Sequence, residues 1–175
     1  MTTQAVTARH LILVGMMGAG KTTVGREIER RTGWPYLDND ALVRTLTGRD
    51  PDAIWAAEGE DVLHLAESDA FDSAFDVEPP VVIGVAAAIV MDPAAREALR
   101  EGGHVAWLRA RPETLLERIG GGAGRREEAT DLDWIRRRAR ERDLLYAAVA
   151  HQIIDVDKMA PDEIATTILA GLPGA

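Results

Sequence analysis

Residues 15–22 carry the clearest chemical pattern in the chain, Gly-x-x-x-x-Gly-Lys-Thr, at the end of an apolar run. In such a phosphate loop, backbone N–H groups point at phosphate oxygens, and the helix behind it adds the positive end of its dipole. Lys21 supplies a cation for the β- and γ-phosphates, and the Thr22 hydroxyl is placed to bind Mg²⁺. The pattern predicts a nucleotide site, the alternative being a glycine-rich turn that binds none. The candidate nucleotide-binding residues here are Gly15, Gly18, Ala19, Gly20, Lys21, Thr22 and Thr23.

Two carboxylates, Asp38 and Asp40, follow the next predicted strand. Because parallel α/β sheets bind ligands at the carboxyl ends of their strands, we expect these side chains near the phosphate loop. The alternative is that one of them only caps the helix that begins there.

The elements that must position these residues alternate between strands and helices. Strands are predicted at residues 10–14, 35–38, 81–85, 104–108 and 152–156. Helices are predicted at residues 21–32, 40–46, 52–57, 59–75, 112–119, 131–148 and 161–170, and another begins at Pro93 behind the N-cap Asp92. This alternation predicts an α/β fold, a five-stranded parallel sheet with helices on both faces, in one domain over residues 1–175.

A glycine-rich segment begins at residue 120 and ends at the pair Arg125 and Arg126. We interpret residues 120–131 as a mobile lid that closes over ATP, the alternative being a passive loop. A second basic segment, 136–142, is interpreted as a solvated helix face at Arg136, Arg138 and Arg140.

The composition of the chain argues against several classes of binding partner. The formal net charge of −9 argues against general binding to nucleic acid or to an anionic membrane. The chain has no cysteine and no apolar run long enough to span a bilayer. We therefore expect a cytoplasmic protein that acts on a small molecule as a monomer, with no nucleic-acid or membrane partner.

Further blocks follow the phosphate loop in a fixed order. They are Leu37-Asp38-Asn39-Asp40, Thr47-Gly48-Arg49, Ala57-Glu58-Gly59-Glu60, Pro112-Glu113-Thr114 with Arg118, and Arg142-x-x-Leu145-Tyr146-x-x-Val149-Ala150. Together they resemble the shikimate kinase family over nearly the whole chain. The resemblance implies a phosphate-loop kinase fold like that of nucleoside monophosphate kinases, with ATP and Mg²⁺ as cofactors and a hydroxyl of shikimate or a related small polar acid as phosphate acceptor.

The resemblance also implies roles for individual residues. Lys21, Asp40 and Arg125 are the catalytic candidates: Asp40 positions or deprotonates the acceptor hydroxyl, and Arg125 stabilises the transferring phosphoryl group. Thr22 and Asp38 are the metal candidates, and Arg118 stacks on adenine. The candidate acceptor-binding residues are Asp40, His64, Ala87, Ala88 and Arg142, of which Arg142 binds the acceptor carboxylate.

Three departures from the family pattern lie near the acceptor and lid. His64 stands where the family has an arginine, Ala86-Ala87-Ala88 replaces three glycines, and Arg125-Arg126-Glu127-Glu128 replaces Arg-Pro-Leu-Leu. Histidine offers fewer donors than arginine and is mostly neutral near pH 7, although Glu60, one helical turn earlier, could favour its charged form. Alanines add methyl groups and disfavour positive φ by roughly 1 kcal/mol or more each.

The acceptor therefore stays open at the level of sequence. Shikimate is one reading, and a kinase for a different small acid, alcohol or polyol is a second. A low-activity ATP-binding homologue with a regulatory or partner-binding role is the third, because a fold and a nucleotide loop do not fix the acceptor.

Overall fold

A parallel sheet lies at the centre of the computed structural model, which describes residues 9–120 and 131–174. Its five strands run in the order β2-β3-β1-β4-β5. They are β1 (His10–Val14), β2 (Tyr36–Asp38), β3 (Val82–Gly84), β4 (Gly103–Arg109) and β5 (Gln152–Asp155). In the register, Leu13 pairs with Gly84, and Val14 pairs with Trp107. The predicted α/β class and parallel sheet are confirmed.

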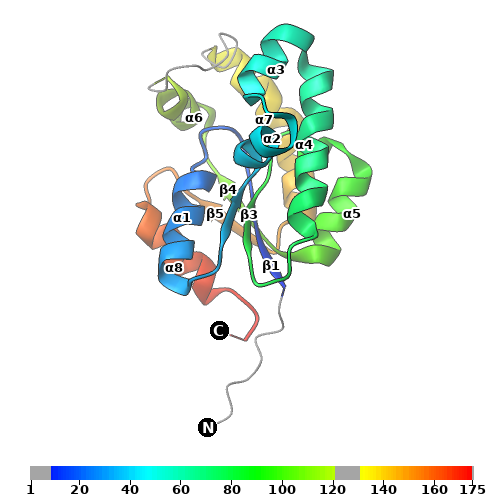
Figure 1. Cartoon of the computed structure of the whole chain (residues 1–175). Helices are drawn as coiled ribbons and strands as arrows, with labels where there is room; N and C mark the ends of the chain where they lie inside the picture. Colours follow the sequence, from blue (N-terminus) through cyan, green and yellow to red (C-terminus); the bar gives the residue numbers. More distant parts are fainter. Residues whose placement is uncertain (1–8, 121–130, 175) are drawn as a thin grey trace.

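Helices cover both faces of the sheet, which explains why β1 is an uninterrupted apolar run (Figure 1). Helices α1 (Lys21–Thr32) and α8 (Pro161–Ala170) lie side by side on one face. Helices α5 (Pro93–Gly102) and α7 (Leu132–Val149) pack against β4 from the other.

Two helices stand over the carboxyl end of the sheet, and a third runs from there down along its side; the three are called the acceptor helices below (Figure 1). They are α2 (Asn39–Thr47), α3 (Pro51–Glu58) and α4 (Glu60–Phe75). They enclose a small apolar cluster of their own, separate from the main core, formed by Val43, Ile54, Leu63, Ala66 and Ala70. The acceptor helices therefore share this cluster, while Phe71 and Ala74 tie the later part of α4 to the main core.

Element boundaries follow the sequence signals closely. The Asp92 carboxylate caps α5 by accepting from the Ala94 N–H at 2.9 Å, as predicted. Helix α6 (Pro112–Ile119) has its predicted bounds. Strand β3 is shorter than the predicted 81–85, because the chain leaves the sheet after Gly84 and forms an unpredicted 3-10 turn, η1 (Ile89–Met91). Among the described residues, no helix is both long and apolar enough to cross a membrane.

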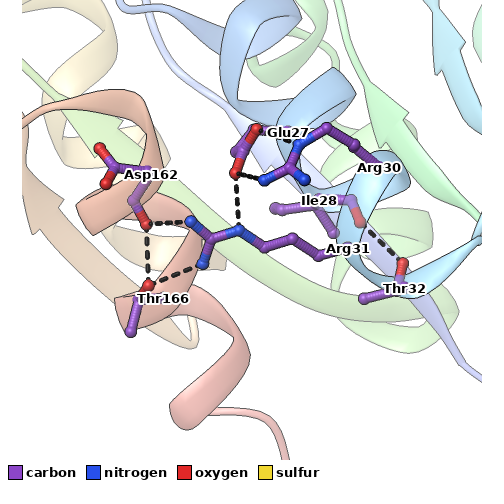
Figure 2. A network of polar contacts seen from close by, with 7 residues as sticks. All are labelled: Glu27, Ile28, Arg30, Arg31, Thr32, Asp162 and Thr166. Atoms are coloured by element: carbon purple, nitrogen blue, oxygen red, sulfur yellow. Dashed lines mark hydrogen bonds and ion pairs between the residues drawn. The ribbon is translucent and has the colours of Figure 1, made fainter.

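Arg31 fixes α8 to α1, as Figure 2 shows. Its guanidinium donates to the Glu27 carboxylate at 2.7 Å on its own helix, and to the Thr166 hydroxyl at 2.7 Å and the Asp162 carbonyl at 3.0 Å on α8. Arg31 therefore joins α1, which begins at the phosphate loop, directly to α8.

Candidate active site

The phosphate loop lies between β1 and α1, as its sequence predicts. Gly20 is the N-cap of α1 with φ of 98°, a left-handed conformation that favours glycine, and no side chain caps the helix. The first N–H groups of α1 therefore face the cleft, where they suit an anion. The Lys21 ammonium donates to the carbonyls of Gly15 at 2.7 Å and Met16 at 3.2 Å, which holds the lysine along the loop.

Lys21 is half-buried, and its charge is correspondingly costly. Burial lowers the pKa of its ammonium to about 8, against the opposing influence of Asp40 and Asp38. A triphosphate beside this lysine would favour its charged form.

Asp38 joins the phosphate loop to the acceptor helices. Its Oδ2 accepts from the Thr22 hydroxyl at 2.9 Å and the Tyr36 hydroxyl at 3.1 Å, while its Oδ1 accepts from the Ala41 N–H at 3.2 Å. Asp38 is therefore the N-cap of α2, as the capping alternative stated, and also lies against the loop threonine.

Tyr36 is a site residue that the sequence pattern did not single out. Its ring fills a slot between two glycines: a Cβ built on Gly25 would lie 2.2 Å from the ring, and one on Gly84 would lie 2.2 Å from the hydroxyl. The backbone of α1 and of β3 thus approaches closely enough to fix the hydroxyl that holds Asp38.

The donor set around Thr22 suits a divalent cation that arrives with phosphates. Among residues 9–120 and 131–174, no cluster of three or more His, Asp or Glu side chains could hold a metal by itself. Thr22 and Asp38 offer adjacent oxygen atoms, and Mg²⁺ typically binds through one or two carboxylates together with substrate phosphates.

One cleft of about 730 Å³ extends from the phosphate loop to the acceptor helices, a volume typical of ligand sites. Gly15 contributes the carbonyl that holds Lys21, and Arg125 lies outside the described residues. The predicted site residues that line the cleft are Gly18, Ala19, Gly20, Lys21, Thr22, Thr23, Asp38, Asp40, His64, Ala87, Ala88, Arg118 and Arg142.

Asp40 lies at the open side of this cleft, in the first turn of α2. Withdrawal of its carboxylate from water raises its pKa, and the charge of Asp38 acts in the same direction. Lys21 and Arg44 oppose this shift. A carboxylate whose pKa is raised accepts a proton more readily than an ordinary aspartate does.

Arg142, on α7, is a buried cation in the wall of the cleft, with 5% of the residue exposed. Its Nε is buried and has no hydrogen-bond partner, and Nη1 lies 3.8 Å from the Met16 sulfur. No carboxylate of the described residues forms an ion pair with it. Because an unpaired buried charge is costly, this arrangement favours an anionic ligand.

His64 lines the cleft from α4, with its Nε2 3.6 Å from Glu60 Oε1, so the predicted contact one turn apart is confirmed. The predicted solvated face is wrong for Arg138. Its side chain is 25% exposed and donates to both Glu60 oxygens, at 2.8 and 3.0 Å. Arg136 and Arg140 are exposed, as predicted.

The three alanines are accommodated without backbone strain. No residue other than glycine has a positive φ in the described part of the chain, and Ala88 has φ of −84°. The Ala87 carbonyl accepts a hydrogen bond of 2.6 Å from the buried Tyr146 hydroxyl. The replacements therefore add methyl groups to the wall but do not incur the conformational cost considered from sequence.

Residues of α6 and α8 also line the cleft. Arg118, on α6, lines it and donates to the Val156 carbonyl at 2.8 Å. Met159, Pro161 and Ile164 line the cleft as well, the last two from α8. The Arg31 contacts described above hold α8, which carries Pro161 and Ile164, against α1.

The tryptophans and Asn39 lie in the apolar clusters or in the wall of the cleft. Trp107 is buried in the core, and Trp34, Trp55 and Trp134 are partly buried against apolar clusters. Trp134 also lines the cleft. Asn39 is buried in the cleft wall with its Nδ2 lacking a partner, and nothing in its sequence context indicated this.

Comparison with known proteins identifies the family to which this chain belongs. The family described as "Shikimate kinase" matches residues 17–173. A shikimate kinase from Symbiobacterium thermophilum is 37% identical over 167 residues, covering 93% of this chain and 95% of the relative.

Solved structures give the same result. A shikimate kinase from Acinetobacter baumannii in complex with shikimate superposes with a TM-score of 0.85 at 30% identity, covering 93% of this chain and 92% of that one. A gluconokinase from Sinorhizobium meliloti, with a TM-score of 0.64 at 21% identity over 94% of this chain and 91% of that one, shares the fold. The predicted resemblance is confirmed: the chain belongs to the shikimate kinase family of phosphate-loop phosphotransferases, which use ATP to phosphorylate a hydroxyl group.

Proposed function

We propose that this protein transfers the γ-phosphate of ATP to a hydroxyl of shikimate. The observation that carries the proposal is Arg142, a buried cation in the same cleft as Lys21 and Asp40 with no acidic partner among the described residues. An acceptor carboxylate would pair with the charge of this arginine, since a planar carboxylate can accept hydrogen bonds from two parallel N–H groups.

The residues divide the work along the cleft. Gly15, Gly18, Ala19, Gly20 and Thr23 form or flank the phosphate cradle, and Lys21 holds the β- and γ-phosphates. Thr22 and Asp38 would hold Mg²⁺, which when bound neutralises charge on the phosphates. Arg118 supports the adenine ring, and Arg125 acts from the lid over residues 120–131.

Asp40 and Arg142 orient the acceptor for in-line transfer. Arg142 fixes the carboxylate at one end, with His64, Ala87 and Ala88 forming the adjoining wall. Asp40 accepts the proton of the attacking hydroxyl, which its raised pKa favours. The hydroxyl oxygen then bonds to the γ-phosphorus as the bond to the β-phosphate oxygen breaks, which leaves ADP.

The test is ADP formation in a coupled assay with ATP, Mg²⁺ and shikimate, with Lys21→Ala as the blank. We expect saturable turnover that depends on shikimate and no turnover with an analogue that lacks the carboxylate. A broad acceptor screen is run beside it. Turnover with another acceptor but none with shikimate would refute the proposal.

His64 in place of the family arginine favours a second candidate, a kinase for a different small acid. A histidine leaves more room and fewer donors than an arginine. The same screen separates the two, because a different acid would then give the higher kcat/KM.

A further inference from the structure

Among residues 9–120 and 131–174, more acidic than basic side chains line the cleft, which matters for an acidic acceptor. Its cations are Lys21, Arg44, Arg118 and Arg142. Its acids are Asp38, Asp40, Asp52, Glu60 and Glu67. Like charges in a cleft of low dielectric repel each other strongly. An acceptor carboxylate at Arg142 therefore depends on how the acidic side chains near it are neutralised.

Glu60 is neutralised from outside the cleft by Arg138. The Arg138 Nη2 donates to Glu60 Oε1 at 2.8 Å and to Oε2 at 3.0 Å, so both carboxylate oxygens are engaged. The two side chains are 25% and 36% exposed, and they lie far apart in sequence, on α7 and α4. A charge-assisted pair that is partly shielded from water is stronger than an ordinary surface ion pair.

Arg138 is itself held in place by α7. Its guanidinium carbon lies 5.3 Å from the centre of the Trp134 ring, which lines the cleft one turn earlier. Its Nη1 lies 3.6 Å from Glu141 Oε2. Arg142 is one turn later on the same face of the helix. The cation that neutralises Glu60 and the cation that faces the acceptor thus share one rigid helix.

His64, which stands where the family has an arginine, lies beside this pair. Its Nε2 is 3.6 Å from the Glu60 oxygen to which Arg138 donates. Without Arg138, the unpaired Glu60 charge would draw the His64 ring toward itself and repel an acceptor carboxylate. With Arg138, that charge is satisfied, and His64 can turn a donor to the cleft.

We propose that Arg138 is a positioning residue for the acceptor, because it holds and neutralises Glu60 so that His64 and Arg142 can face the acceptor carboxylate. The proposal rests on the proposed function, since it requires an acidic acceptor. Arg138 does not line the cleft and acts through Glu60.

The test is a double-mutant cycle on the full-length protein: wild type, Arg138→Gln, Glu60→Gln and the double variant, with Arg140→Gln as a control at an exposed cation on the same helix. The KM for shikimate, the KM for ATP, kcat and the melting temperature are measured for each. We expect Arg138→Gln to raise the KM for shikimate about tenfold and to leave kcat and the KM for ATP within about twofold. Glu60→Gln should leave the KM for shikimate equal or lower, and the double variant should return it close to wild type.

Other outcomes overturn the proposal. If the pair were only a latch between α4 and α7, Arg138→Gln and Glu60→Gln would raise the KM for shikimate alike and lower the melting temperature alike. If Arg138 contacted the acceptor directly, the double variant would stay as poor as Arg138→Gln. An unchanged KM for shikimate in Arg138→Gln leaves the proposed function intact and removes this inference.

A wild type that ignores shikimate refutes the proposed function by itself. The cycle is then measured with the acid that the acceptor screen identifies, and the same pattern of KM values supports the role of Arg138. A wild type that phosphorylates only uncharged acceptors, or none, overturns the inference as well.

Discussion

The nucleotide end and the acceptor end of the cleft are built differently. The phosphate loop continues directly from β1, which pairs with β3 and β4 inside the main core. The acceptor helices instead enclose a small cluster of their own, and α4 reaches the main core through Phe71 and Ala74. Loop geometry is set by backbone and by glycines, whereas the acceptor end is set by side chains that can be exchanged one at a time. Among the described residues, the departures from the family pattern are His64 on α4 and the alanines that follow β3, and both line the cleft.

The largest expected effect comes from a variant that disables the nucleotide end of the cleft. Lys21→Ala removes the cation that faces the β- and γ-phosphates and should lower kcat by about 10³-fold. Steady-state ADP release measures it, with Arg26→Ala as a control at an exposed cation on the same helix. Activity within tenfold of wild type in Lys21→Ala would mean that the phosphates bind elsewhere.

The next effect separates the two ends. Arg142→Met should raise the KM for shikimate by about 10²-fold while the KM for ATP changes little. Because the variant also removes a buried charge that has no acidic partner in the described residues, its melting temperature should be unchanged or higher. A fall in the melting temperature together with an unchanged KM for shikimate would show that Arg142 serves the fold instead of the acceptor.

A smaller effect tests the junction between the ends. Tyr36→Phe removes the hydroxyl that holds Asp38 but keeps the ring between Gly25 and Gly84. ADP should bind about threefold more weakly in the presence of Mg²⁺, since the net worth of one such hydrogen bond is about 0.5–1.5 kcal/mol. Calorimetry without Mg²⁺ is the matched comparison, and equal losses with and without the metal would count against a role through Asp38.

The smallest effect concerns protons at the nucleotide end. Lys21 has a pKa of about 8 in the free protein, and bound phosphates should raise it. Nucleotide binding at pH 8 should therefore take up about half a proton, and affinity should fall as the pH rises above 8. Calorimetry in two buffers of different ionisation enthalpy measures the uptake. Lys21→Met should abolish it, and proton release in the wild type would contradict the account.

The sequence predicted the position of the phosphate loop between β1 and α1, because the spacing of glycine, lysine and threonine depends directly on backbone geometry. The capping of α5 by Asp92 and the Glu60–His64 contact followed from helical spacing in the same way. Arg138 did not, since its partner lies 78 residues away on α4 and only the folded arrangement of the two helices brings the side chains together. Tyr36 was missed for a similar reason: the slot that holds its ring is made by glycines on two other elements.

The alanines at 86–88 show a property that the sequence could not predict, namely the backbone dihedral angles of a turn. The sequence raised the question of a cost at positive φ, and the answer depended on dihedral angles that no local pattern reports. The structure keeps them at negative φ, so the family's glycines are not needed to form this turn.

The central claim is that one cleft holds nucleotide phosphates at Lys21 and an acceptor carboxylate at Arg142. A crystal structure with ADP and shikimate tests it most directly. We expect the β-phosphate within hydrogen-bond distance of the N–H groups of the phosphate loop, and the shikimate carboxylate within hydrogen-bond distance of the Arg142 guanidinium, with a hydroxyl facing Asp40. Shikimate bound away from Arg142, or ADP bound away from the loop, would contradict it.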